Sequence, residues 1–386
     1  MKRISVPPRP NWQAIAEQNG FFFHHVHGEL YWDESVCYAF TLPEIEQGLE
    51  DPAQELAHMC RDLAADIVNS EELLEKLAIP RDLWDVVRDS WVRNEPSLYG
   101  RFDFVFDGEN PAKLYEYNAD TPTALYEASC FQWVWLEDAI KSGILPPGVD
   151  QFNSIHEKLV NRFGDFGVAE RMHFASMRGS EEDRATVAYL ADCARQGGVD
   201  TKQIFMEDIG IDAGGQFVDT DNEAIRWLFK LYPWEYVWGE EYAARLLHSD
   251  TTFIEPPWKM VLSNKGILPL LWERYAGHPN LLPAWFHDET QAALTDDYVL
   301  KPLLSREGGN VQVFKDRQLI YAAEGEYGAE GYIGQQLALP PYIDGFAPIC
   351  GVWIVGDQSC GLGIREDSSP ITTNLDRFVP HYITSE

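Results

Sequence analysis

Residues 101–122 read RFDFVFDGENPAKLYEYNADTP, and they contain the most informative part of the sequence. Two runs of strand-like composition, 99–106 and 113–118, flank the cluster Asp107-Gly108-Glu109-Asn110-Pro111. Aromatic residues that alternate with polar ones are typical of half-buried strands, and a cluster of Asp, Gly, Asn and Pro is typical of a turn. The sequence therefore predicts a β-hairpin over residues 99–120.

Because side chains alternate between the faces of a strand, the hairpin is predicted to have an aromatic face and a polar face. The aromatic face is expected to hold Phe102, Phe104, Phe106, Tyr115 and Tyr117. The polar face is expected to hold Arg101, Asp103, Val105, Leu114, Glu116, Asn118 and Asp120. Two carboxylates and an amide are hard oxygen donors, which suit Mg²⁺ when phosphate oxygens complete its octahedron. An exposed, salt-bridged sheet face is the alternative interpretation.

Net charge is the unusual feature of the composition, because 30 Lys and Arg against 62 Asp and Glu give −32. Such a surface repels phosphate backbones and anionic lipids, so it disfavours nucleic-acid and membrane partners and favours amines or divalent metals. Otherwise, 386 residues with 45% hydrophobic residues are typical of a globular protein with two or three folding units. The six cysteines lack C-x-x-C spacing and the N-terminus lacks a signal peptide, which predicts a reduced, cytoplasmic protein.

Hydrophobic periodicity divides the chain into regions of different structure. Residues 11–98 are predicted to be mostly helical, with helices that begin at Asp51 and Ser70 and a third that contains Trp91. From 123 to 250, strands and helices alternate, which favours a doubly wound α/β lobe. Within it, the predicted strands are 168–177 and 204–206, and the predicted helices are 181–196 and 224–232. The last 130 residues read as strand-rich and punctuated by glycine.

Two lysines downstream are candidates for binding phosphate. Lys265 follows an apolar run, and Lys301 ends another one just before the glycine-containing segment 305–310. A lysine at a strand end beside such a turn can place an ammonium and backbone N–H groups against phosphate oxygens. Two surface lysines and an ordinary turn are the alternative. Residues 325–334 form a second glycine-rich segment, which fits either a mobile cover or a simple loop.

Several common signatures are absent from the sequence. It contains no G-x-x-x-x-G-K-[ST] phosphate loop, no H-E-x-x-H helix and no G-x-S-x-G elbow. The stretch 361–366 begins like a dinucleotide fingerprint but lacks its third glycine. His24, His25 and His27 have no Cys or carboxylate at ligand spacing, so a histidine cluster on a strand or sheet edge is favoured over a metal site.

The ordered set of motifs resembles the glutathionylspermidine synthetase family of ATP-grasp ligases. The resemblance is carried by residues 101–103, 115–122 and 231–235, and then by Lys301-Pro302 and residues 308–311. It extends from about residue 12 to the C-terminus. It implies an ATP-grasp fold of mixed α+β and α/β type, as a single unit over residues 1–386. Within that unit, an α/β lobe is expected near 150–250 and the main nucleotide-holding lobe near 255–386.

The resemblance also implies roles for individual residues at matching positions. Asp103, Glu116 and Asn118 are implied as Mg²⁺ ligands, and Arg101 and Arg365 as catalytic arginines. The positions implied to bind ATP are Arg101, Lys265, Lys301, Gly308, Gln335, Gln336, Leu337, Pro370, Ile371 and Thr372. Thr121 and Glu182 fall near positions that contact the acid and amine substrates in the family.

By this resemblance, the chain is expected to be an ADP-forming acid–amine ligase that uses ATP and Mg²⁺ and passes through an acyl phosphate. The expected partners are a small carboxylic acid, peptide-like in the family, and an amine such as a polyamine. Bifunctional members carry an N-terminal cysteine amidase domain, for which this chain has no room. Glu307 is a further departure, since the phosphate loop is expected to be less acidic. The alternatives are a true glutathionylspermidine synthetase without an amidase and a non-catalytic remnant that binds nucleotide or polyamine.

Overall fold

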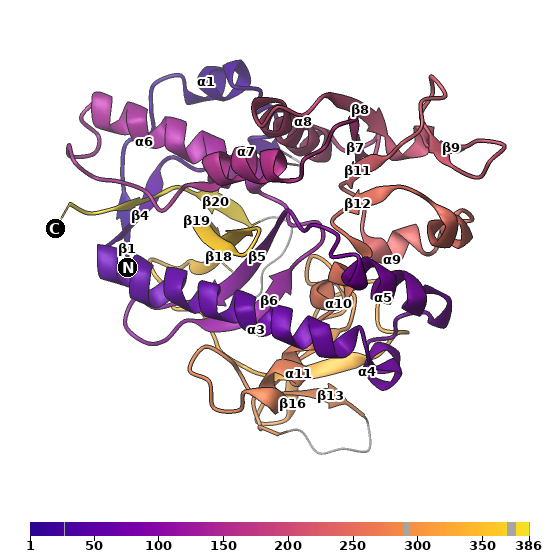
Figure 1. The fold of residues 1–386 in the computed structure, drawn as a ribbon. Helices are drawn as coiled ribbons and strands as arrows, with labels where there is room; N and C mark the ends of the chain where they lie inside the picture. Colours follow the sequence, from indigo (N-terminus) through magenta and orange to yellow (C-terminus); the bar gives the residue numbers. More distant parts are fainter. Residues whose placement is uncertain (27, 289–293, 369–375, 386) are drawn as a thin grey trace.

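The computed structural model describes residues 1–26, 28–288, 294–368 and 376–385 (Figure 1). At its centre lies a five-stranded sheet in the order β20-β19-β18-β5-β6. Its strands are β5 (Tyr99–Val105), β6 (Lys113–Asn118), β18 (Ala347–Val355), β19 (Gln358–Asp367) and β20 (Arg377–Val379). The predicted hairpin is confirmed as β5 and β6, and β5 pairs on its other side with β18, about 250 residues further along the chain.

The central sheet is covered by helices on both faces. On one face lies α3 (Asp51–Ile67), which carries Pro52 in its first turn, where a missing N–H costs nothing. Its apolar side shares a core with Phe102, Phe104 and Tyr117, which confirms much of the predicted aromatic wall. On the opposite side of the sheet in Figure 1 lie α6 (Gln132–Lys141) and α7 (Ile155–Asp165).

The N-terminal region is less helical than predicted. The expected helices are α3, α4 (Glu71–Lys76), capped by the Ser70 hydroxyl, and α5 (Trp84–Val92). Between residues 21 and 40, however, the chain forms the short strands β2 (His25–Val26) and β3 (Glu29–Leu30) and then β4 (Val36–Phe40). β4 lies between β1 (Lys2–Ser5) and β21 (His381–Ile383), so its partners come from both ends of the chain. Short helices α1 (Trp12–Gln18) and α2 (Leu42–Ile45) flank these strands.

The predicted α/β lobe contains a parallel sheet in the order β12-β11-β7-β8. Its strands are β7 (Met172–Ser176), β8 (Thr201–Phe205), β11 (Trp227–Lys230) and β12 (Thr252–Ile254), and α8 (Glu181–Gln196) connects β7 to β8. The predicted helix over 224–232 is wrong, because this segment contains β11. A short apolar run suits a buried strand as well as a helix, and here Leu228 and Phe229 are buried between two parallel neighbours. A small hairpin, β9 (Gly210–Ile211) and β10 (Phe217–Val218), precedes β11.

A second five-stranded sheet, entirely antiparallel, has the order β13-β17-β14-β15-β16. Its strands are β13 (Ala284–His287), β14 (Tyr298–Pro302), β15 (Gln312–Lys315), β16 (Gln318–Ala322) and β17 (Tyr332–Gln336). Helices α10 (Met260–Ser263) and α11 (Ile267–Arg274) precede it, and α9 (Trp234–Val237) follows β11. All six cysteines are free thiols in this structure. Among the described residues, no helix combines the length and apolar character needed to cross a membrane.

Candidate active site

Cross-strand pairing in the β5–β6 hairpin brings the predicted polar residues together. Asp103 lies opposite Glu116, and Arg101 lies opposite Asn118. The Asn118 amide donates to Asp103 Oδ2 at 3.1 Å and to Glu116 Oε1 at 3.2 Å. Arg101 Nε and Nη2 lie 2.6 Å and 3.0 Å from the two oxygens of Asp103, and Arg365 Nη2 lies 2.9 Å from Oδ2. Three residues with oxygen donors thus converge on one face, with guanidinium groups beside them.

A β-bulge changes the predicted faces of the hairpin. The register shifts between Asp103 and Phe104, so β6 carries one extra residue at this point. The prediction is therefore wrong for two residues: Leu114 packs into the core beside Phe104, and Tyr115 lies on the polar side. Phe102 and Tyr117, beyond the shift, keep the predicted alternation and stack with ring centroids 4.0 Å apart.

Lys265 and Lys301 reach the same end of the hairpin from separate segments. Lys265 Nζ lies 3.1 Å from Glu116 Oε2 and donates to the Ser305 carbonyl. Lys301 Nζ donates to Gln335 Oε1 at 2.8 Å and lies over the Tyr115 ring. Burial lowers the pKa of Lys301 to about 8. Burial alone would raise the pKa of Glu116, but the two ammonium groups hold it well below its usual range.

A cavity of about 310 Å³ lies between this charged cluster and the second sheet. Its apolar walls include Val299, Val313, Ile320, Leu337 and Leu339, and its polar end includes Asp103, Glu116, Lys265, Lys301 and Gly308. Apolar walls with a few convergent charged groups are typical of a small-molecule site, and this division suits a base at one end and phosphates at the other.

The residues near the C-terminal end that were predicted to bind ATP have different environments. Gln336 and Leu337 line the apolar part of the cavity. Gln335 also lines it, but its amide bonds Lys301 and the Leu114 carbonyl, so it holds the lysine in place. Residues 370–372, the predicted Pro370, Ile371 and Thr372, lie outside the described part of the chain.

A second, smaller cavity of about 110 Å³ adjoins the first, and Glu116, Ser305 and Gly308 line both. Arg101, Arg306 and Arg365 line this second cavity, together with Asn118 and residues 121–123. Arg306 received no role from the sequence. It donates from Nη1 to Thr121 Oγ1 and from Nε to Glu235 Oε1, both at 2.7 Å. Only the fold reveals these contacts, because Thr121 lies 185 positions and Glu235 71 positions from Arg306 in the sequence.

Two carboxyl groups near Arg365 have raised pKa values. Glu127 is 1% exposed; its Oε1 accepts from the Tyr31 hydroxyl at 2.5 Å, and its Oε2 is buried without a partner. Burial raises the pKa of Glu127 to about 7. Burial, reinforced by Glu127, Asp183 and Glu307, raises the pKa of Glu182 to about 8. Glu182 was predicted near a substrate, whereas Glu127 was missed because only the fold brings it to the arginines.

Asp103, Glu116 and Asn118 form a donor set that fits Mg²⁺. Carboxylate and amide oxygens are the ligands this hard cation prefers, and cross-strand pairing directs all three residues to one place. Guanidinium and ammonium groups offset the carboxylate charges there. Rotation of the Asn118 amide would turn its oxygen, in place of its nitrogen, toward the carboxylates.

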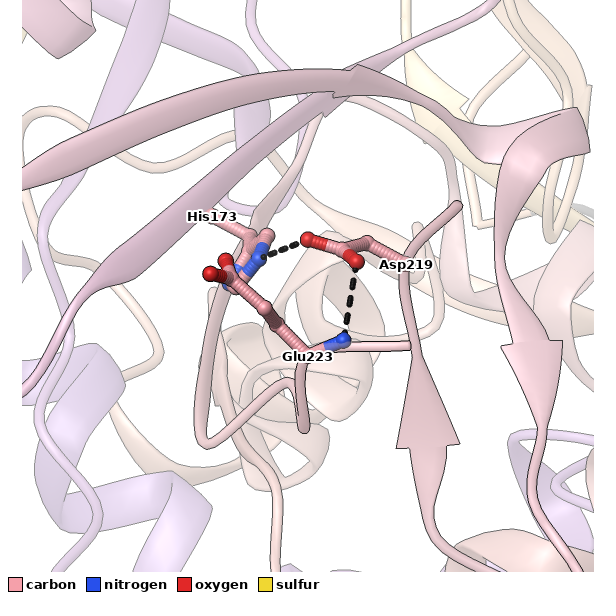
Figure 2. A group of neighbouring side chains, drawn as sticks. All are labelled: His173, Asp219 and Glu223. Atoms are coloured by element: carbon pink, nitrogen blue, oxygen red, sulfur yellow. Dashed lines mark hydrogen bonds and ion pairs between the residues drawn. The ribbon is translucent and has the colours of Figure 1, made fainter. Parts of the chain in front are cut away.

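His173, Asp219 and Glu223 form a separate group of candidate metal ligands in the α/β lobe (Figure 2). His173 Nε2 lies 3.0 Å from Asp219 Oδ2. Lys202 Nζ, however, lies 2.6 Å from Asp219 Oδ2 and 3.2 Å from Glu223 Oε2. The Lys202 ammonium group already supplies the positive charge that a metal would bring, so we interpret this group as an ion-pair network in which His173 and Asp219 are buried and Glu223 is exposed.

Comparison with known proteins identifies the family. The model for "Glutathionylspermidine synthase preATP-grasp" matches residues 3–384. The chain belongs to this glutathionylspermidine synthase family. A protein of Haemophilus influenzae named "Putative acid--amine ligase" is 42% identical over 99% of both chains. Trypanothione synthetase of Crithidia fasciculata is 30% identical over 82% of this chain, and the bifunctional glutathionylspermidine synthetase/amidase of Escherichia coli is 27% identical over 87%.

This member of the glutathionylspermidine synthase family spans 51% of the trypanothione synthetase and 58% of the bifunctional enzyme. A solved structure of a glutathione synthetase-like effector from Globodera pallida matches 83% of this chain and 87% of its own, with a TM-score of 0.52 at 11% identity. At that identity the match shows the fold alone. The predicted ATP-grasp fold and family are confirmed.

Proposed function

We propose that this protein is an ATP- and Mg²⁺-dependent acid–amine ligase that forms an amide through an acyl phosphate. One observation carries the proposal: a largely apolar cavity has two lysines and two carboxylates in its lining, and a second cavity lined by three arginines adjoins it at Glu116, Ser305 and Gly308. The first space suits a nucleotide and the second a phosphoryl group and the acid that receives it. The names of the relatives support the class of carbon–nitrogen ligase.

ATP binds in the larger cavity, with its base between the apolar walls and its phosphates toward Lys265 and Lys301. Asp103, Glu116 and Asn118 would hold Mg²⁺ at the phosphate end. When bound, the ion supplies positive charge to the phosphate oxygens. Lys265 then exchanges its contact with Glu116 for one with phosphate, and the Glu116 carboxylate becomes available as a ligand.

In the first chemical step, an oxygen of the acid's carboxylate attacks the γ-phosphorus. The bond between this phosphorus and the bridging oxygen breaks, and ADP leaves with the electron pair. Charge spreads over the equatorial oxygens of the transferring group, where fixed guanidinium groups stabilise it without reorganisation. Arg101 and Arg365 flank Asp103 and line the receiving cavity, so they are the groups we assign to this role.

In the second step, the amine attacks the carbonyl carbon of the acyl phosphate, and phosphate leaves with the C–O electron pair. An amine that arrives as an ammonium must first lose a proton. Glu182 lies near Arg365, and its raised pKa makes its ionised form a stronger base than an ordinary carboxylate, so this form can accept that proton. The further N–H proton lost when the amide forms leaves with the phosphate. A cationic substrate would lower the pKa values of Glu127 and Glu182 and pair with their carboxylates, which supports a polyamine over a neutral amine.

The test is ADP release from MgATP by the purified protein with a panel of carboxylic acids and amines that includes glutathione and spermidine. We expect ADP to form only when an acid and an amine are both present, and mass spectrometry to find the amide in equal amount. Activity restricted to glutathione with spermidine would identify a glutathionylspermidine synthetase. Nucleotide binding without turnover on the whole panel would contradict the ligase proposal and favour a binding protein.

A further inference from the structure

Two successive residues of α9 contact two different loops, one of which lines the nucleotide cavity. Glu235 Oε1 accepts a hydrogen bond from Arg306 Nε at 2.7 Å, and Arg306 belongs to the loop 303–311, called here the phosphate-side loop. The Tyr236 hydroxyl lies 3.0 Å from that of Tyr327, which belongs to the loop 323–331, called here the outer loop. One short helix of the α/β lobe therefore meets both loops.

The two loops also bind each other and form one cover. Tyr327 N donates to Asn310 Oδ1 at 2.8 Å, and Ala323 N donates to the Val311 carbonyl at 2.9 Å. Their approach is close: a Cβ on Gly309 would lie 3.1 Å from the Tyr327 ring. A displacement of one loop therefore disturbs the other.

The helix that meets the two loops is held close to the end of β6, the strand that carries two of the three candidate metal ligands. Asp120, two residues beyond Asn118, accepts from the backbone N–H of Trp234 at 2.8 Å. Its other oxygen lies 2.8 Å from Lys230 Nζ, and both side chains of this ion pair are fully buried. Charge-assisted hydrogen bonds in such surroundings are stiff and costly to break, so α9 has a defined position relative to β6.

We propose that Glu235 and Tyr236 are positioning residues of the active site: they dock the cover on α9 and so place the Arg306 guanidinium beside Thr121, in the cavity with Arg101 and Arg365. Glu235 accepts from Nε of Arg306 and Thr121 accepts from Nη1, which leaves Nη2 for the anionic substrate. The docking follows from contacts of the chain alone. Its effect on turnover rests on the proposed function.

Hydrogen exchange of the ligand-free protein tests the docking without any substrate. In Glu235→Ala, amide exchange in the phosphate-side loop should rise by about tenfold or more, as expected for loss of a charge-assisted contact. In Tyr236→Phe, the larger rise should occur in the outer loop. Glu240→Gln is the matched control, because Glu240 follows the same helix and accepts from Tyr232. Exchange equal to wild type in both loops of both variants would overturn the proposal.

Steady-state kinetics tests the consequence for Arg306. Glu235→Ala and Arg306→Ala should each lower kcat by about 10- to 100-fold and change the KM for ATP much less. The double variant should lose no more than Arg306→Ala alone, because Glu235 acts through that arginine. Independent, multiplicative losses, or a loss that merely follows a lower Tm, would overturn the positioning role. If the wild type shows no turnover, the ligase proposal fails, while the exchange result still decides the docking.

Discussion

At the scale of single residues, Glu116 has a pKa that depends strongly on the charges of two neighbouring lysines, Lys265 and Lys301. Glu116→Gln preserves size but removes the negative charge that Lys265 and Lys301 compensate. MgATP affinity should fall by about tenfold or more, because a hard cation loses a charged ligand. The Lys301 pKa, already lowered to about 8, should fall further when the neighbouring carboxylate is gone. Calorimetric titration with MgATP measures the first effect.

The control for that experiment is Glu109→Gln, which removes the same charge from the exposed turn of the same hairpin. A Glu116→Gln protein that binds MgATP as tightly as this control would remove Glu116 from the metal site.

Glu127 links the site to the pH dependence of stability. Its pKa is about 7 in the folded protein and near 4.5 when unfolded, so the folded state binds more protons between these values. Stability should therefore fall as the pH rises from about 5 to about 8. Glu127→Gln keeps an acceptor for Tyr31 but cannot ionise, so its Tm should fall less over that range. Thermal unfolding at several pH values measures this, and parallel curves for the two proteins would contradict the assignment.

At the scale of elements, a glycine of β18 sets the position of Arg101. Gly351 lies opposite Asp103, and a Cβ there would lie 2.8 Å from Arg101 Cδ. Gly351→Ala should displace the guanidinium and lower kcat by about tenfold or more, with a smaller effect on ATP binding. Gly210→Ala, where a Cβ meets only an ordinary contact at 3.5 Å, is the control. Equal kcat values for the two variants would show that Arg101 tolerates the shift.

Local patterns predicted the elements that depend on local interactions. Helices α3 and α8 and the β5–β6 hairpin follow from periodicity, capping and turn residues within each segment. β4 and β11 were missed because their partners lie far away in the sequence. The bulge at Tyr115 was missed for a different reason: the prediction assumed strict alternation, which gives no sign of an extra residue.

In the candidate site, too, some residues were recognised from the sequence and others were found only in the fold. Asp103, Glu116, Asn118, Lys265 and Lys301 were recognised from motifs, and the fold brings all five together. Arg306 and Glu127, which were not recognised, hold positions in the site through contacts with segments distant in sequence. No pattern within their own segments distinguishes them from surface residues.

At the scale of the whole molecule, a net charge of −32 must repel itself in the folded state. Raising the ionic strength from about 10 to about 200 mM should therefore raise the Tm by several degrees, because screening weakens this repulsion. Sodium chloride and choline chloride should act alike, since screening depends on ionic strength and not on the cation. An unchanged or lower Tm in both salts would contradict this account.

The pairing of β5 with β18 has a consequence for how the protein is made. A ribosome releases residues 99–105 long before it has synthesised residues 347–355. The edge of β5 that pairs with β18 therefore stays unpaired through most of translation. The edge of β4 that pairs with residues 381–383 stays unpaired even longer. Contacts between residues so distant in sequence form late in folding, and until then these strands expose unpaired edges. The nascent chain therefore cannot assemble this active site, and a stalled or shortened product is a candidate for chaperone binding rather than a partly active enzyme.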